Sequence, residues 1–178
     1  MQKYLSLNVI IFFCCVLFIS CNSATPEKYF GVAVLNSNMQ FGFAGDGFLR
    51  QLESPSVKMS ETSSQPVPMQ RSEVINQKIQ FTEEALEKLK ELKETPDTKD
   101  ILQNALALYD YILPVYKNEY TQLAKLYDEQ APKEQINQQV QAIHDKYFAP
   151  YETLYNKLIS SGKLYAEKHS IKVNWGVY

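Results

Sequence analysis

The sequence predicts an all-α protein: an up-and-down bundle of three to four helices, in which the long helices are kinked by proline. Over three long segments, apolar residues recur with the 3.6-residue period of an amphipathic helix. Short joints built around proline separate these segments, and helices with short joints pack as antiparallel neighbours. All three cysteines lie within the first 21 residues, so the folded part should contain no disulfide and no cysteine metal site.

Residues 1–20 have the pattern of a signal peptide. Lys3 is the only charged residue before Glu27, and every residue from 9 to 19 is apolar. A positively charged start followed by an apolar run of this length is typical of secretion signals. A membrane-spanning helix needs about 20 apolar residues. We therefore expect cleavage on export, with an uncleaved membrane anchor as the alternative.

The leader ends in Phe18-Ile19-Ser20-Cys21, which resembles the lipobox of bacterial lipoprotein precursors. The last three residues fit that pattern, and Phe18 stands where leucine is usual. The resemblance implies cleavage before Cys21, a diacylglycerol on its thiol and an N-acyl group on the new amino terminus. Residues 21–24 would then be the acylated tether, because two or three acyl chains hold a soluble domain on a bilayer at about 0.8 kcal/mol per buried CH₂. In the alternative, Cys21 is an incidental small residue near an ordinary cleavage site.

The same resemblance implies a location. No aspartate follows Cys21, and the neighbouring Asn22-Ser23 resembles lipoproteins that Gram-negative cells pass on to the outer membrane. We expect a protein of the bacterial cell envelope, anchored in the outer membrane, with the leaflet left open. The membrane is the expected partner, and other envelope proteins are further candidates. With 18 basic and 20 acidic residues and no clustered basic face, the chain gives no reason to expect nucleic acid.

Residues 25–178 make up the predicted bundle domain, which opens with a helix over residues 26–52. Thr25-Pro26 supplies an N-cap hydroxyl and a first-turn proline. Apolar residues then recur every seven positions, at Val34, Phe41 and Phe48, with Ala44 and Leu52 on nearly the same stripe. Glycines between residues 42 and 47 predict an imperfect helix there, and a β-hairpin around residues 36–38 is the alternative.

Residues 55–71 are rich in serine, threonine and proline and show no period. Such a composition predicts a flexible, exposed loop.

Three clear helices follow this loop. Ser72 should cap the first, Thr95-Pro96 should separate it from the second, Ala131-Pro132 should begin the third, and the third should fade near residues 160–162. The predicted core stripes are Ile75, Ile79, Thr82, Leu86 and Leu89; Leu102, Ala105, Tyr109, Ile112, Tyr116 and Leu123; and Ile136, Val140, Ile143, Tyr147, Tyr151, Leu154 and Leu158. Residues 170–178 alternate in polarity and should form an extended tail on the bundle.

Two prolines inside the long helices mark the one region that suggests a binding site. Pro114 and Pro150 lie at similar distances from the turn near Ala131, so both helices should bend at the same height. The candidate ligand-binding residues in this slab are Tyr109, Tyr111, Tyr116, Tyr147, Tyr151 and Tyr155. They could line a groove for an apolar or aromatic ligand or a peptide, or they could simply fill the space that the kinks open.

The sequence contains no catalytic signature. HExxH, paired-cysteine and EF-hand patterns do not occur, so neither a metal nor another cofactor beyond the lipid on Cys21 is expected. The segment Gly42-Phe43-Ala44-Gly45-Asp46-Gly47 lacks the lysine of a phosphate-binding loop. The prediction is therefore a non-enzymatic, lipid-anchored envelope lipoprotein with a binding or structural role. The alternative is a small-molecule or lipid-binding helical module that uses the tyrosines near Pro114 and Pro150.

Overall fold

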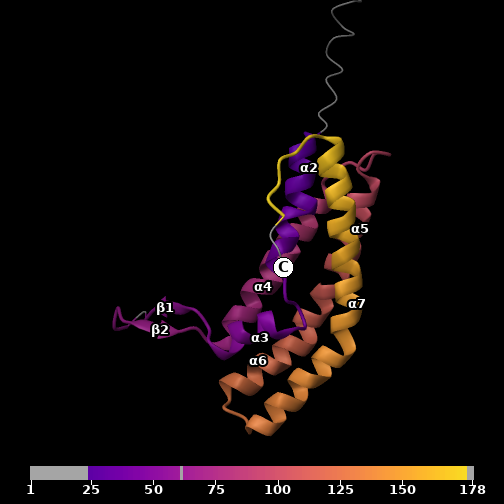
Figure 1. The fold of residues 1–178 in the computed structure, drawn as a ribbon. Helices are drawn as coiled ribbons and strands as arrows, with labels where there is room; N and C mark the ends of the chain where they lie inside the picture. Colours follow the sequence, from indigo (N-terminus) through magenta and orange to yellow (C-terminus); the bar gives the residue numbers. More distant parts are fainter. Residues whose placement is uncertain (1–23, 61, 176–178) are drawn as a thin grey trace, which may run out of the picture.

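A computed structural model describes residues 24–60 and 62–175, so the predictions for the leader, for Cys21 and for residues 176–178 lie outside the described part. The described chain is all-α apart from one small hairpin, which confirms the predicted class (Figure 1). Its elements in chain order are α2 (Pro26–Ala33), the 3₁₀ helix η1 (Leu35–Gln40), α3 (Asp46–Glu53), β1 (Val57–Met59), β2 (Pro66–Pro68), α4 (Arg71–Lys90), α5 (Lys99–Val115), the π-helical turn η2 (Tyr116–Tyr120), α6 (Thr121–Asp128) and α7 (Lys133–Lys168).

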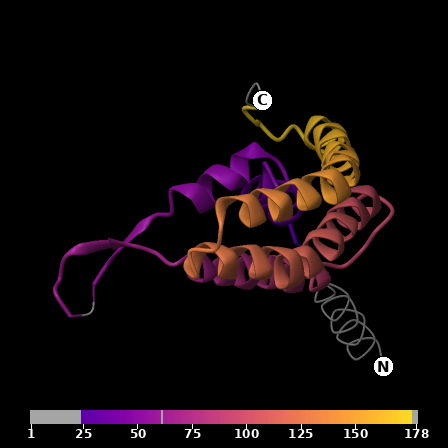
Figure 2. The same ribbon diagram turned by 90° about the horizontal axis from the view of Figure 1, so that it is seen from below.

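The three predicted long helices form the frame of the bundle. The α5–η2–α6 segment and α7 form an antiparallel helical hairpin, and α4 packs along α5 and α6 (Figures 1 and 2). Both arms of the hairpin change direction midway, as the two prolines predicted (Figure 1). The predicted stripe of the α5–α6 arm is buried throughout, with every member 2% exposed or less.

The bend in the first arm coincides with a local change of helix type. Proline has no N–H to donate, so the ladder is interrupted at Pro114, and the π-helical turn Tyr116–Tyr120 follows directly. The side-chain amide of Asn118 donates to the Pro114 carbonyl at 2.9 Å, and the Thr121 hydroxyl donates to the Tyr116 carbonyl at 3.0 Å. Tyr116 and Tyr120, at the two ends of this turn, are both buried.

The third helix is longer than predicted. It continues without a break through residues 160–162 and ends at Lys168. The sequence signal at Gly162 has another cause, because a Cβ at this position would lie 2.9 Å from Val34 Cγ1. Glycine therefore lets α7 approach the end of α2 closely, while the helix itself continues.

The amino-terminal segment is helical but broken, so neither one helix over residues 26–52 nor a hairpin at residues 36–38 forms. Gly42 and Ala44 have left-handed φ angles of 77° and 57°, which no α-helix accommodates. The chain therefore turns between η1 and α3. Phe41 falls in this turn and is 50% exposed, in contrast to its predicted core position, whereas Phe48 and Leu52 are buried.

The start of α4 also differs from prediction, because Gln70 and not Ser72 is its N-cap. The Gln70 backbone N–H donates to the Glu73 carboxylate at 2.8 Å. Asp128, at the end of α6, accepts the backbone N–H groups of Arg71 and Ser72 at 2.8 and 2.9 Å. Partial burial opposes the charged form, but these hydrogen bonds outweigh it and hold the pKa of Asp128 below its ordinary value. The first turn of α4 is thus capped by a residue from another helix.

Two predicted irregular segments complete the fold. The exposed loop at residues 55–71 contains the antiparallel hairpin of β1 and β2, which projects from the bundle (Figures 1 and 2). Residues 171–175 belong to no helix or strand and run back beside α2 (Figure 1). The Trp175 ring meets Phe30 edge-on at a centroid distance of 5.8 Å, which fixes this segment to the bundle.

Candidate functional site

The structure divides the six predicted tyrosines among three environments. Tyr109 and Tyr116 are fully buried in the core. Tyr111 and Tyr147 meet edge-on at 6.2 Å on the partly exposed side of the helical hairpin. Tyr151 and Tyr155 lie on the remaining side, where they line a groove. The six residues therefore do not form one common site.

Several of the buried rings form an aromatic cluster that packs against the turn between η1 and α3. Phe43 packs against Tyr116, Tyr120 and Tyr151 at centroid distances of 5.2 to 5.7 Å. Phe48 meets Tyr116 and Tyr120 at 5.5 and 4.8 Å, mostly edge-on. Edge-to-face pairs at these distances are favourable, so the cluster is a packed core that supports the turn.

The tyrosine hydroxyls hold this turn in place. Tyr116 and Tyr151 donate to the side-chain and backbone oxygens of Gln40 at 3.1 and 2.8 Å. The Tyr120 hydroxyl accepts the backbone N–H of Ala44 at 3.0 Å. Gln40 is itself buried and donates to the Thr82 hydroxyl at 3.1 Å, which ties the turn to α4. These hydroxyls act as fixed structural contacts.

One buried hydroxyl has no such contact. The Tyr109 oxygen is buried without a hydrogen-bond partner among the described residues. Burial raises the pKa values of Tyr109, Tyr116, Tyr120 and Tyr151 well above the ordinary tyrosine value, because the ionised ring would lose its hydration. All four phenols are therefore neutral over the physiological pH range.

The groove beside this core is the strongest candidate for a functional site. It has a volume of about 690 Å³ and lies between the turn with α3 on one side and α7 on the other. Its α7 wall begins just before Pro150 and consists of Phe148, Tyr151, Glu152, Tyr155, Asn156, Ile159 and Lys163. These residues are spaced by three or four and extend over roughly 22 Å of one helix face.

The opposite wall is formed by Phe41, Gly42, Gly45, Asp46, Gly47 and Arg50. The glycines bring this wall close to α7, because a Cβ on Gly45 would lie 2.9 Å from the Phe148 ring. Phe41 faces Tyr155 at a centroid distance of 6.2 Å. The groove thus has an aromatic interior formed by two segments that are about 100 residues apart in the sequence.

The rim of the groove carries charges of both signs. Arg50 and Lys163 contribute positive charge, and Asp46 and Glu152 contribute negative charge. All four residues are exposed. This balance favours a ligand with an apolar or aromatic body and polar groups that reach the rim, and it gives no preference for a strongly charged molecule.

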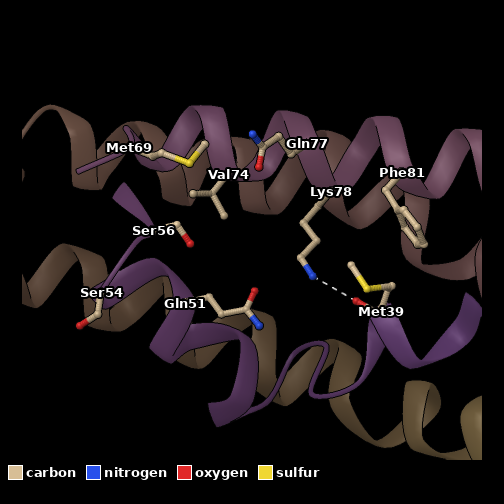
Figure 3. Close-up of a pocket in the computed structure, with 9 residues that line it drawn as sticks. All are labelled: Met39, Gln51, Ser54, Ser56, Met69, Val74, Gln77, Lys78 and Phe81. Atoms are coloured by element: carbon tan, nitrogen blue, oxygen red, sulfur yellow. Dashed lines mark hydrogen bonds between the residues drawn. The ribbon is translucent and has the colours of Figure 1, made fainter. Parts of the chain in front are cut away.

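A second, smaller pocket lies on the other side of α3, against α4 (Figure 3). It has a volume of about 270 Å³, and its lining includes Met39, Met69, Val74 and Phe81. The Lys78 ammonium donates to the Met39 carbonyl at 3.0 Å (Figure 3). It also lies 5.4 Å from the Phe48 ring centroid. Burial lowers the pKa of Lys78. This lysine fastens the end of η1 to α4, and the pocket is a lesser candidate than the groove.

Sequence reasoning missed half of the groove. The sequence pattern predicts a core position for Phe41, and it indicates for Gly45 and Gly47 only an imperfect helix and a poor match to a phosphate-binding loop. The sequence signal that could have identified Phe41 is its position directly before Gly42, at the start of a glycine-rich segment, since an aromatic residue in a glycine-rich turn is not constrained to face inward. Phe148, Glu152, Asn156 and Ile159 follow helical spacing from Tyr151 and Tyr155, but nothing local predicts what faces them.

Two further properties concern only the part of the chain that the structure describes. Within residues 24–60 and 62–175, no three histidine, cysteine or acidic side chains come together as metal ligands. None of the helices described is both long and apolar enough to cross a bilayer. Comparisons of the chain with protein-family models, curated proteins and solved structures found no significant match.

Proposed function

We propose that this protein is a lipid-anchored lipoprotein of the bacterial cell envelope, attached through Cys21, that acts by binding and not by catalysis. Its bundle binds an uncharged amphipathic or aromatic molecule in the α3–α7 groove. The observation that carries the binding role is the aromatic groove of about 690 Å³. This volume falls within the roughly 300–1,000 Å³ range of small-molecule sites.

The walls of the groove favour a preformed site. The hydroxyls of Tyr116, Tyr120 and Tyr151 all form hydrogen bonds to residues in or next to the turn between η1 and α3, which fixes its position. The α7 wall belongs to a continuous helix. A ligand that enters such a site does not have to order it first, which reduces the free-energy cost of binding.

Occupancy of the groove can be tested with a pair of tryptophan variants. Asn156 lines the groove and is exposed, so Asn156→Trp should fill the groove without disturbing the core. Lys157→Trp is the matched control, because Lys157 is equally exposed but lies about 100° further around α7 and outside the groove. Binding is measured with the neutral fluorescent dye N-phenyl-1-naphthylamine and by native mass spectrometry of protein purified from its own host.

We expect the dye to bind the native protein and Lys157→Trp equally, and Asn156→Trp about tenfold more weakly, since the variant removes both contacts and volume. A bound mass of reproducible size in the native protein should be absent from Asn156→Trp. Equal dye binding by all three proteins, or no bound mass under several purification conditions, would remove the ligand-binding role.

The anchor is tested separately with Cys21→Ala. Because the thiol is the expected site of acylation and cleavage is expected directly before it, this variant should carry no acyl chain and should accumulate as the uncleaved precursor, whose apparent mass is higher because it keeps residues 1–20. Labelling with a radioactive fatty acid in the same cells should mark the native protein and not the variant. A Cys21→Ala protein that still takes up the label, or that is cleaved and still fractionates with membranes, would place the anchor elsewhere.

A further inference from the structure

The hairpin formed by β1 and β2 is largely exposed, with only Val67 partly buried in its two strands, and it extends away from the bundle (Figure 2). Its base is fixed to the first turn of α4 by an ion pair between Lys58 and Glu73. The Met69 N–H donates to the Ser56 carbonyl at 2.8 Å, and the Ser60 N–H donates to the Gln65 carbonyl at 2.8 Å. The hairpin is therefore a fixed projection with a defined register.

That register determines which backbone groups point outward. Hydrogen-bonded and non-hydrogen-bonded pairs alternate along an antiparallel ladder. Because Ser56–Met69 and Ser60–Gln65 are hydrogen-bonded pairs, Lys58 and Val67 form the hydrogen-bonded pair between them. The N–H and C=O groups of Val57 and Met59 consequently point away from β2 at the outer edge of β1. No backbone or side-chain partner for them occurs among the described residues.

The two edges of the hairpin differ in their ability to accept another strand. On the outer edge of β2, the positions opposite Met59 and Val57 are Pro66 and Pro68, which have no N–H. Proline at outward positions is a recognised means of closing a sheet edge. The β1 edge has no such protection and retains both donors and acceptors. The hairpin is therefore closed to strand addition on one side and open on the other.

The side chains at the open edge are apolar and exposed. Val57 and Met59 are 65% and 62% exposed, and they share one face of the hairpin with Pro66 and Pro68, which are also exposed. Lys58 points to the other face. An added strand could therefore satisfy the free backbone groups and cover this apolar face at the same time.

We propose that the outer edge of β1 binds an extended segment of another protein by strand addition. The segment would carry apolar residues opposite Val57 and Met59 and an acidic residue between them, opposite Lys58. Backbone hydrogen bonds supply affinity in this mode, and alternate side chains supply specificity. A second copy of this chain fits less well, because pairing two β1 strands about their centres would place Lys58 opposite Lys58, and directly opposed like charges are destabilising.

The test uses the full-length protein in detergent micelles and a synthetic capped peptide, Thr-Val-Glu-Val-Thr. Amide hydrogen exchange at Val57 and Met59 is followed by NMR. At saturating peptide, exchange at these two amides should slow by about tenfold or more, because they become hydrogen-bonded. The Lys58 amide, already bonded within the hairpin, should change little and serves as the internal control. A peptide with lysine in place of glutamate should bind more weakly.

Variants at one position separate the backbone and side-chain contributions. Met59→Pro removes an outward donor, and we expect it to weaken peptide binding about tenfold or more, while Met59→Leu should bind like the native protein. Met59→Thr keeps the donor and reduces the apolar contact, so it should be intermediate. Protection of the Lys58 amide in each variant shows whether the hairpin is still folded.

Several outcomes would overturn the proposal. Hydrogen exchange at the Val57 and Met59 amides that stays unchanged at millimolar peptide would show that the peptide does not pair with this edge. Equal peptide binding by Met59→Pro and Met59→Leu, with the hairpin intact in both, would show that the outward N–H of residue 59 is not used. Self-association that Met59→Pro abolishes would assign the edge to a second copy. Protection of these amides by phospholipid vesicles without peptide would make the hairpin a membrane contact.

Discussion

Two identical substitutions in the buried core should change stability in opposite directions. Tyr109 and Tyr116 are both fully buried on the same helical arm. The Tyr109 hydroxyl has no partner among the described residues, whereas the Tyr116 hydroxyl donates to Gln40 Oε1 at 3.1 Å. Replacing each tyrosine with phenylalanine removes only the hydroxyl, so the two variants isolate the contribution of a satisfied and an unsatisfied polar group.

The expected change in the free energy of unfolding depends on whether removal of the hydroxyl leaves another buried polar group without a hydrogen bond. A buried polar group without a partner costs about 1–3 kcal/mol. Removing it also loses a few dispersion contacts of about 0.1–0.2 kcal/mol each, so Tyr109→Phe should stabilise the protein by about 1 kcal/mol. Tyr116→Phe leaves the buried Gln40 Oε1 without its donor and should destabilise by about 1–3 kcal/mol. At about 2–4 °C per kcal/mol, the two melting temperatures should differ by roughly 8 °C.

Guanidinium unfolding followed by circular dichroism at 222 nm, together with thermal melts, measures both free energies of unfolding. The denaturant slope should be the same for both variants, since neither changes the surface exposed on unfolding. If Tyr109→Phe destabilises the protein by more than 1 kcal/mol, its hydroxyl has a partner such as a bound water, and the reasoning is wrong. Equal destabilisation by both variants would refute it as well.

Three further expectations concern other parts of the molecule. Gly162→Ala should lower the free energy of unfolding by about 1–3 kcal/mol, because its Cβ would lie 2.9 Å from Val34. Gly31→Ala is the control: the space around it is open, so this variant should raise the free energy of unfolding by up to about 1 kcal/mol. Thermal melts compare the two, and equal effects would contradict the close packing at Gly162. Asp128→Ala should cost about 1 kcal/mol in urea unfolding because it uncaps α4. Since the folded pKa of Asp128 is lowered, the stability that its carboxylate contributes is complete above pH of about 4 and is lost as the pH falls further. A stability difference between the native protein and Asp128→Ala that persists at pH 2 would contradict the capping role. Burial raises the pKa values of Tyr109, Tyr116, Tyr120 and Tyr151, so the stability that these neutral rings contribute is complete below pH of about 10 and is lost above it. The part of the tyrosinate absorbance at 295 nm that belongs to these four of the twelve tyrosines should rise only together with loss of circular dichroism, and ionisation of all twelve in a folded protein would contradict the burial.

The sequence by itself determined the all-α class, the frame of long helices and the height of the bend. Helical period and proline are local properties, so the stripe that includes Leu102, Ala105 and Ile112 could be assigned to the core without knowledge of its neighbours. The lipid anchor at Cys21 remains a prediction from the leader.

Only the tertiary structure decided where the candidate site lies. Gly162 resembles a helix end in the sequence, yet it marks a close contact with Val34. Phe41 shares the period of the core but is exposed, because left-handed residues after it redirect the chain. The groove needs this turn and α7 to meet across about 100 residues. A periodic pattern fixes which side of a helix is apolar, whereas the segment that covers that side depends on packing between distant parts of the chain.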